Sequence, residues 1–210
     1  MGNIPYKSPI GIPLPHMTDE QKKDLQLMRS SAKQREWTTS QDILKRLFAT
    51  LDPLLALQIG APRLQAFLPT FEQYYPDAGW VRELMLTVIS YASAPTDLPE
   101  GTINQFPSPG CGNFVRAVLD SARTVQDKYT VFERYSHATN LIANAILAEL
   151  TQLYFAERPE LYAQFIDPET DPEIRTKIQH DFWLDKTVSQ TDQKLWLQIA
   201  YELKKRIEGK

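Results

Sequence analysis

The chain has 210 residues, 42% of them hydrophobic and 10% aromatic, so it can bury a sizeable core and is not disordered throughout. Its length favours one domain over two. The formal net charge of −3 argues against a dedicated nucleic-acid binder, which normally carries a basic face, and the single cysteine excludes an internal disulfide and a four-thiolate metal site.

Residues 1–17 predict an extended N-terminal arm, because four prolines and two glycines interrupt this segment. Apolar residues lie between the prolines, which suggests that the arm packs on its own domain or on a neighbour, and we expect Ile10, Ile12 and Leu14 to contact another protein or a second copy of this chain. The alternative is an ordered or frayed terminus without a binding role. The arm lacks the features of a signal peptide, and no stretch of the chain approaches the roughly 20 apolar residues of a membrane span. We therefore expect a cytoplasmic protein.

Apolar residues at helical spacing predict a series of helices after the arm. Thr18 and Gln21 match a capping box at the start of the first. Gly60 is expected to stop a short helix, Pro62 to start the next one, and Pro69 to kink or divide it. The helices predicted in this half of the chain cover about 18–34, 39–51, 54–59, 62–71 and 77–94.

Residues 95–112 form a predicted loop with four prolines and three glycines. Loops of this length inside a compact domain are uncommon and usually either functional or disordered. We therefore expect this loop, with Phe106, to take part in an interaction. The alternative is a connection without a function of its own.

Residues 113–158 contain neither proline nor glycine, which predicts a long central helix or two tightly joined helices. The apolar stripe is interrupted by polar residues at 136–140 and then resumes in nearly the same phase. The preserved phase favours one continuous helix over 113–158. If two helices meet instead, Ser136 or Thr139 is expected to cap the second.

Shorter helices are predicted after Pro159, after Asp171 and after Ser189 or Thr191. No segment alternates apolar and polar residues as a strand does, and no repeat of fixed period is present. The predicted fold class is all-α. It consists of the arm and a single irregular bundle of about seven to nine helices over residues 18–210, with 113–158 at its centre.

The polar residues Glu133, His137, Asn140 and Asn144 share one face of the predicted central helix, because they follow each other at intervals of four, three and four. If this face points inward, it forms the wall of a ligand pocket. Glu133 would then orient the imidazole, and the two amides would bind a carbonyl or carboxylate of the ligand. The alternative is an exposed or internally hydrogen-bonded polar face.

Cys111 lies between two glycines at the predicted start of the central helix. Backbone donors and the helix dipole favour a thiolate there, so Cys111 is a candidate reactive thiol. Catalysis would also need a base, for which His137 and His180 are the candidates. The alternative is a small loop residue without chemistry.

The chain lacks the common phosphate-binding, dinucleotide-binding, zinc-protease and serine-hydrolase motifs, and we predict neither a metal site nor a cofactor. This favours a non-enzymatic interaction, adaptor, assembly or regulatory factor that acts through helical surfaces, the arm and the 95–112 loop. The alternative is a helical protein that holds an apolar or tetrapyrrole-like ligand near His137 and Asn144. The third hypothesis is an enzyme that depends on Cys111.

Overall fold

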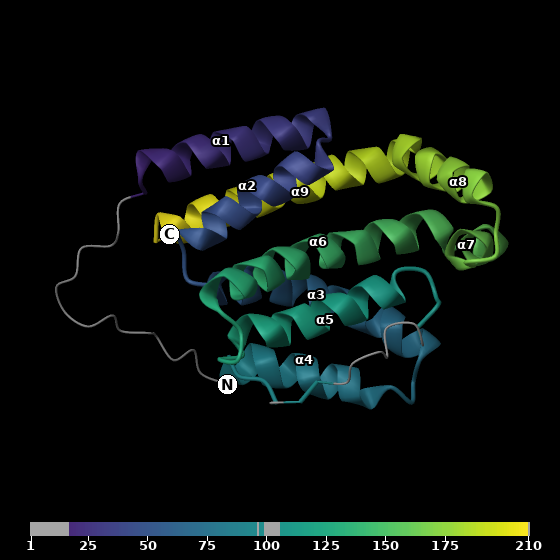
Figure 1. Cartoon of the computed structure of the whole chain (residues 1–210), viewed down its shortest axis with the longest axis horizontal. Coiled ribbons are helices and arrows are strands. Elements are labelled where there is room, and N and C mark those ends of the chain that lie inside the picture. The colour runs from purple at the N-terminus through teal and green to yellow at the C-terminus, as the bar shows by residue number, and fades with distance from the viewer. Residues whose placement is uncertain (1–16, 96, 99–105, 210) are drawn as a thin grey trace.

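A computed structural model describes residues 17–95, 97–98 and 106–209, and these residues form nine helices and no strand (Figure 1). The predicted all-α bundle is therefore confirmed. Ile10, Ile12 and Leu14 lie outside the described residues. In chain order the helices are α1 (Asp19–Gln34), α2 (Trp37–Ala49), α3 (Leu54–Tyr74), α4 (Gly79–Tyr91), α5 (Cys111–Val125), α6 (Val131–Phe155), α7 (Pro159–Ile166), α8 (Pro172–Leu184) and α9 (Lys186–Ile207).

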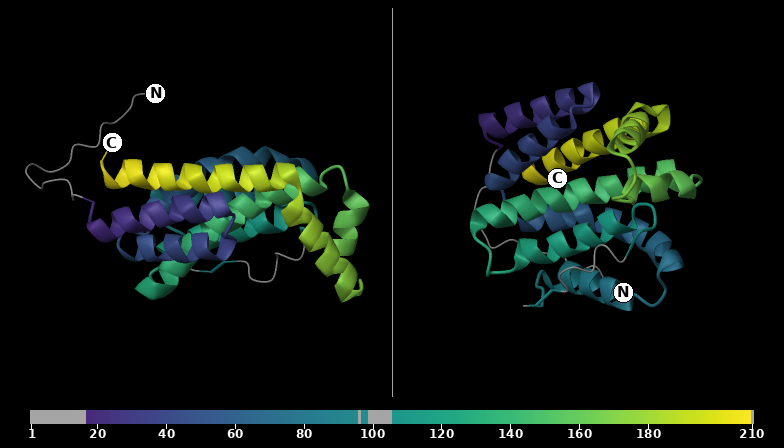
Figure 2. Two further views of the ribbon diagram at one scale, coloured as in Figure 1. Left: turned by 90° about the horizontal axis from the view of Figure 1, so that it is seen from above. Right: turned by 45° about the vertical axis from the view of Figure 1, so that its right-hand side comes forward.

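Helices α5 and α6 occupy the centre of the bundle and share the most extensive interface among the described helices. Helix α3 packs behind both of them and also contacts α9 (Figure 1). Helix α4 lies beyond α5, whereas α9, α2 and α1 lie beyond α6. Helices α7 and α8 project from one end of the bundle (Figure 2). In the described part of the chain, no helix combines the length and the apolar character needed to cross a membrane.

The central segment is two helices, so the preferred prediction of one continuous helix over 113–158 was wrong. A turn over residues 126–130 separates α5 from α6. The hydroxyl of Thr130 accepts a hydrogen bond from the Glu133 amide, and the Glu133 carboxylate accepts one from the Thr130 amide at 2.8 Å. This capping box starts a new helix, which allows α6 to fold back and bury its stripe against α5. Ser136 and Thr139, the expected caps, lie inside α6.

Helix α3 continues through Gly60, Pro62 and Pro69, so the predicted stop at Gly60 was also wrong. A Cβ atom on Gly60 would lie 3.0 Å from Cγ of Leu141, so the glycine permits a close approach between α3 and α6.

Long-range hydrogen bonding compensates for Pro62 within α3. A proline cannot donate to the carbonyl oxygen four residues earlier, which here belongs to Gln58. Arg206 of α9 donates to that oxygen at 3.2 Å instead, and it also donates to the Gln58 side chain at 2.6 Å. The partner that the helix itself lacks therefore comes from a residue far along the chain.

The described end of the 95–112 loop is packed onto the bundle. The ring of Phe106 is 6% exposed and lies between the rings of Phe71 and Tyr75, with centroids at 5.2 and 4.9 Å. The hydroxyl of Tyr75 accepts a hydrogen bond from the Ser108 amide at 2.9 Å. Phe106 thus belongs to the core, and its burial gives no support to the expectation that it contacts a partner.

Candidate functional site

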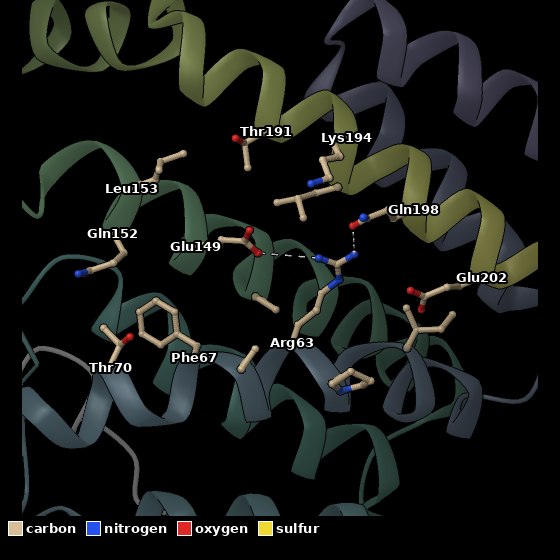
Figure 3. Close-up of a pocket in the computed structure, with 15 residues that line it drawn as sticks. Arg63, Phe67, Thr70, Glu149, Gln152, Leu153, Thr191, Lys194, Gln198 and Glu202 are labelled. Carbon is tan, nitrogen blue, oxygen red and sulfur yellow. Dashed lines mark hydrogen bonds and ion pairs between the residues drawn. The ribbon is translucent and has the colours of Figure 1, made fainter.

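A groove that encloses about 740 Å³ lies between α3, α6 and α9 (Figure 3). Helix α3 lines it from Ile59 to Thr70, a rise of about 16 Å, and α9 lines it over the same length from Thr191 to Glu202. Helix α6 contributes residues between Ala145 and Leu153. The groove is therefore long enough to hold about three turns of a helix.

Arg63 projects from α3 across the groove toward α6 and α9 (Figure 3). Its side chain is only 12% exposed, yet its polar contacts are long. Glu149 Oε2 lies 3.9 Å from Nη1, and Nη2 donates to Gln198 Oε1 at 3.5 Å, whereas strong charged hydrogen bonds measure about 2.8 Å. The Nε atom is buried and has no hydrogen-bond partner among the described residues. The positive charge of Arg63 is therefore weakly compensated.

The pKa of Arg63 reflects this environment. Burial lowers the pKa, because removal from water disfavours the charged form, and this effect exceeds the opposing effect of Glu149 and Glu202. An arginine nevertheless stays protonated at neutral pH. A carboxylate that reached this cation with short, paired hydrogen bonds would compensate its charge better than Glu149 does at 3.9 Å.

The remaining walls combine apolar surface, a buried polar atom that lacks a hydrogen-bond partner, and a lysine. Phe67 and Leu153 lie at one end of the groove (Figure 3), and Leu153 is 46% exposed. Next to Leu153, the Oε1 atom of Gln152 is buried without a hydrogen-bond partner in the described chain. Lys194 lies on the α9 wall. Buried polar atoms without hydrogen-bond partners are uncommon in a protein core. The presence of two such atoms here, Arg63 Nε and Gln152 Oε1, favours a surface that binds a partner.

The predicted polar face on 133–144 is divided in the structure. The carboxylate of Glu133 caps α6, and Asn140 is exposed. His137 and Asn144 instead bind the same carboxylate of α5, that of Asp120. His137 Nδ1 lies 2.9 Å from Oδ1, and the Asn144 amide donates to Oδ2 at 3.3 Å. Asp120, and not Glu133, orients the imidazole.

Asp120 is the residue that sequence reasoning missed. It is 6% exposed, and besides His137 and Asn144 it lies 3.5 Å from a guanidinium nitrogen of Arg123. The ring of Tyr129 contacts the imidazole edge-on, with centroids 4.8 Å apart. A carboxylate with three partners is well satisfied, so this cluster joins α5 to α6 and its polar groups are already engaged. The ligand pocket suggested for this face remains a prediction.

Cys111 is completely buried at the start of α5. Burial raises the pKa of its thiol to about 12, the opposite direction to the one expected from the helix dipole. His180, one of the two candidate bases, lies on α8 with 68% of its side chain exposed. Whether Cys111 reacts stays a prediction, and its surroundings favour the neutral thiol.

In the part of the chain that the structure describes, no three His, Cys, Asp or Glu side chains gather closely enough to hold a metal ion. No protein-family model, curated protein or solved structure matches this chain. Function is therefore inferred from the geometry of the groove.

Proposed function

We propose that this protein is a non-enzymatic helical interaction domain, and that it binds a segment of a partner protein in the α3–α6–α9 groove. The observation that carries the proposal is the burial of Arg63 with only long contacts to Glu149 and Gln198. A partner carboxylate would form the short, paired hydrogen bonds that a guanidinium favours. Such a domain would serve as an adaptor or assembly factor.

The shape of the groove favours a polypeptide segment. Its length of about 16 Å resembles that of the grooves that receive amphipathic helices or extended peptides. Phe67 and the half-exposed Leu153 offer apolar contacts at one end. The expected segment therefore carries an acidic residue for Arg63 and an apolar residue near Leu153.

The charges of the groove argue against a polyanionic partner. Arg63 and Lys194 face Glu149 and Glu202, so the charged side chains of the lining balance. Nucleic-acid sites instead depend on an excess of basic residues along the phosphate backbone. The alternative ligand site near His137 and Asn144 is less favoured, because both side chains already bind Asp120.

Photo-crosslinking from matched positions tests the proposal in the cells that make this protein. A photoreactive residue replaces Ala66, an exposed residue of the groove, and in a control it replaces Ala163, an exposed residue of α7 outside it. We expect a discrete protein adduct from position 66 that is absent from position 163. Mass spectrometry of the adduct identifies the partner, and an adduct of two copies of this chain identifies self-association.

Arg63→Gln provides the second arm of this test. It removes the charge while keeping a polar side chain, so we expect the adduct from position 66 to disappear although the circular dichroism spectrum is unchanged. Equal labelling from positions 66 and 163, or an adduct that persists in Arg63→Gln, would contradict the proposal.

A further inference from the structure

A second hollow, of about 370 Å³, lies where the turn between α1 and α2 meets the corner between α8 and α9. Figures 1 and 2 both show these two corners side by side. The Gln193 side chain of α9 donates to the carbonyl oxygen of Lys33 at 3.3 Å, which links the two corners near the hollow. A volume of this size matches a single side chain or a small molecule, at the lower end of ligand sites.

Two tryptophans line this hollow. The rings of Trp37 and Trp183 have centroids 5.4 Å apart and are inclined at 51°. A third indole, that of Trp196, lies edge-on against Trp37 at 5.2 Å. Indole faces carry partial negative charge and attract cations more strongly than the other aromatic side chains do.

Asp192 of α9 lies in the same lining and is 3% exposed. Its Oδ1 atom is buried without a hydrogen-bond partner, and among the described residues it takes part in no ion pair. Burial raises the pKa of this carboxyl to about 6, against smaller opposing effects of the Trp196 indole and the Arg35 cation. At neutral pH the hollow therefore holds a buried negative charge that lacks a close counterion.

We propose that the hollow between Trp37, Trp183 and Asp192 is a binding site for an alkylammonium cation. A carboxylate supplies the charge, and the indole faces supply a surface that attracts a cation and contacts its alkyl chain. The half-buried tryptophans and the 61% exposed Leu184 leave the site open to solvent. The site is separate from the groove, and the inference does not depend on the proposed function.

Arg35 is the residue of this chain that can compete with an alkylammonium cation for Asp192, because it carries a positive charge, is exposed and lines the same hollow. It ends α1 in the left-handed conformation, with φ of 60°, and it forms no ion pair with Asp192. Its positive charge nevertheless opposes a second cation in the hollow. Removal of this charge should therefore strengthen binding, and removal of the Asp192 charge should weaken it.

Titration of the full chain with butylammonium at about pH 7.5 and constant ionic strength tests the site. The indole N–H signals in a nitrogen–proton NMR spectrum report binding, because Trp37 and Trp183 line the hollow, Trp196 contacts Trp37, and Trp80 lies elsewhere. We expect saturable shifts of the first three signals and none of Trp80. 1-Butanol has a similar size without the charge and should produce no saturable shift.

Two variants and a peptide sharpen the test. Asp192→Asn should weaken butylammonium binding by about tenfold or more, and Arg35→Gln should strengthen it about twofold or more. The affinity of an acetylated and amidated Ala-Lys-Ala peptide is compared with that of butylammonium. Tighter binding of the peptide identifies the ligand as a lysine side chain of a partner, and tighter binding of butylammonium identifies it as a small amine. Equal shifts with 1-butanol, no shifts at all, or unchanged affinity in Asp192→Asn would overturn the inference.

Discussion

His137 of α6 lies 2.9 Å from the Asp120 carboxylate of α5, measured from Nδ1 to Oδ1, and only a fifth of the imidazole is exposed. This contact crosses the most extensive helix interface in the described structure. Because Asn144 and Arg123 converge on the same carboxylate, loss of Asp120 would leave several polar groups without their partner. The cluster therefore stabilises the pairing of α5 with α6 while all of its members are present, and removal of one member leaves at least one other without its partner.

Asp120→Ala should lower the free energy of unfolding by about 2–4 kcal/mol, because it leaves His137, Asn144 and Arg123 facing an empty site. Urea unfolding followed by circular dichroism at about pH 7 measures the change. Asp77→Ala is the matched control, since Asp77 is exposed, and it should change stability by less than about 0.5 kcal/mol. Equal losses in the two variants would show that the Asp120 cluster contributes nothing specific.

The predictions that held rest on neighbouring residues. The capping box of Thr18 and Gln21 is present, with hydrogen bonds of 3.0 and 3.1 Å in the two directions. The Asp171 side chain accepts from the Glu173 amide, as a helix start at that position requires. Caps are made within three residues, so the sequence pattern contains all the necessary information.

The predicted continuous helix over 113–158 failed although a local signal for its interruption, the Thr130–Glu133 capping box, is present in the sequence. The predicted helix stop at Gly60 failed because it depended on residues far along the chain. Gly60 was expected to end a helix, but its small size serves the contact with Leu141, and the carbonyl oxygen freed by Pro62 is satisfied by Arg206. The groove also unites three helices that no local spacing connects. Arg63, a basic residue among the apolar residues of α3, is a local feature of the sequence that lies in this groove.

Gly110 should tolerate no side chain. It precedes α5 in the left-handed conformation, with φ of 78°, and a Cβ atom there would lie 2.9 Å from the Phe67 ring and would overlap the Ala148 carbonyl oxygen. Gly110→Ala is expected to lower stability by about 2 kcal/mol or more and the Tm by about 4–8 °C. Differential scanning calorimetry measures both quantities.

Gly79→Ala is the control for that experiment, because a Cβ atom at this first position of α4 would meet no atom within 4 Å. Alanine also favours the helix, so the Tm should stay the same or rise slightly. If both variants lost stability equally, the steric explanation for Gly110 would be wrong.

Cys111 should not react in the folded protein. Its thiol is fully buried and its pKa is raised to about 12, so very little thiolate forms at about pH 8. We expect a disulfide reagent such as dithiobis(nitrobenzoate) to leave the native chain unlabelled and to label it fully in about 6 M guanidinium chloride. Rapid labelling of the native protein would contradict this expectation and would support the hypothesis of an enzyme that depends on Cys111.

The buried carboxyl of Asp192 should make stability depend on pH. Its pKa in the folded state is raised to about 6 from 3.8, so between these values the folded state binds more protons than the unfolded state. Stability from this residue is therefore present below about pH 4 and is lost as the pH rises to about 6. Asp192→Asn removes this loss and should be more stable than the natural chain by about 2–3 kcal/mol at pH 7, with a much smaller difference at pH 4.

The quantity to compare is the difference in the free energy of unfolding between the natural chain and Asp192→Asn. Other carboxylates titrate in the same pH range, but they affect both chains equally and drop out of this difference. Urea unfolding at several pH values measures this difference, and Asp77→Asn, an exposed control, should run parallel to the natural chain. A saturating concentration of butylammonium should reduce the advantage of Asp192→Asn at pH 7, because the cation binds only the ionised carboxylate of the natural chain. An advantage of the same size at every pH would show that it comes from packing, and a natural chain more stable than the variant at pH 7 would show that Asp192 already has its counterion.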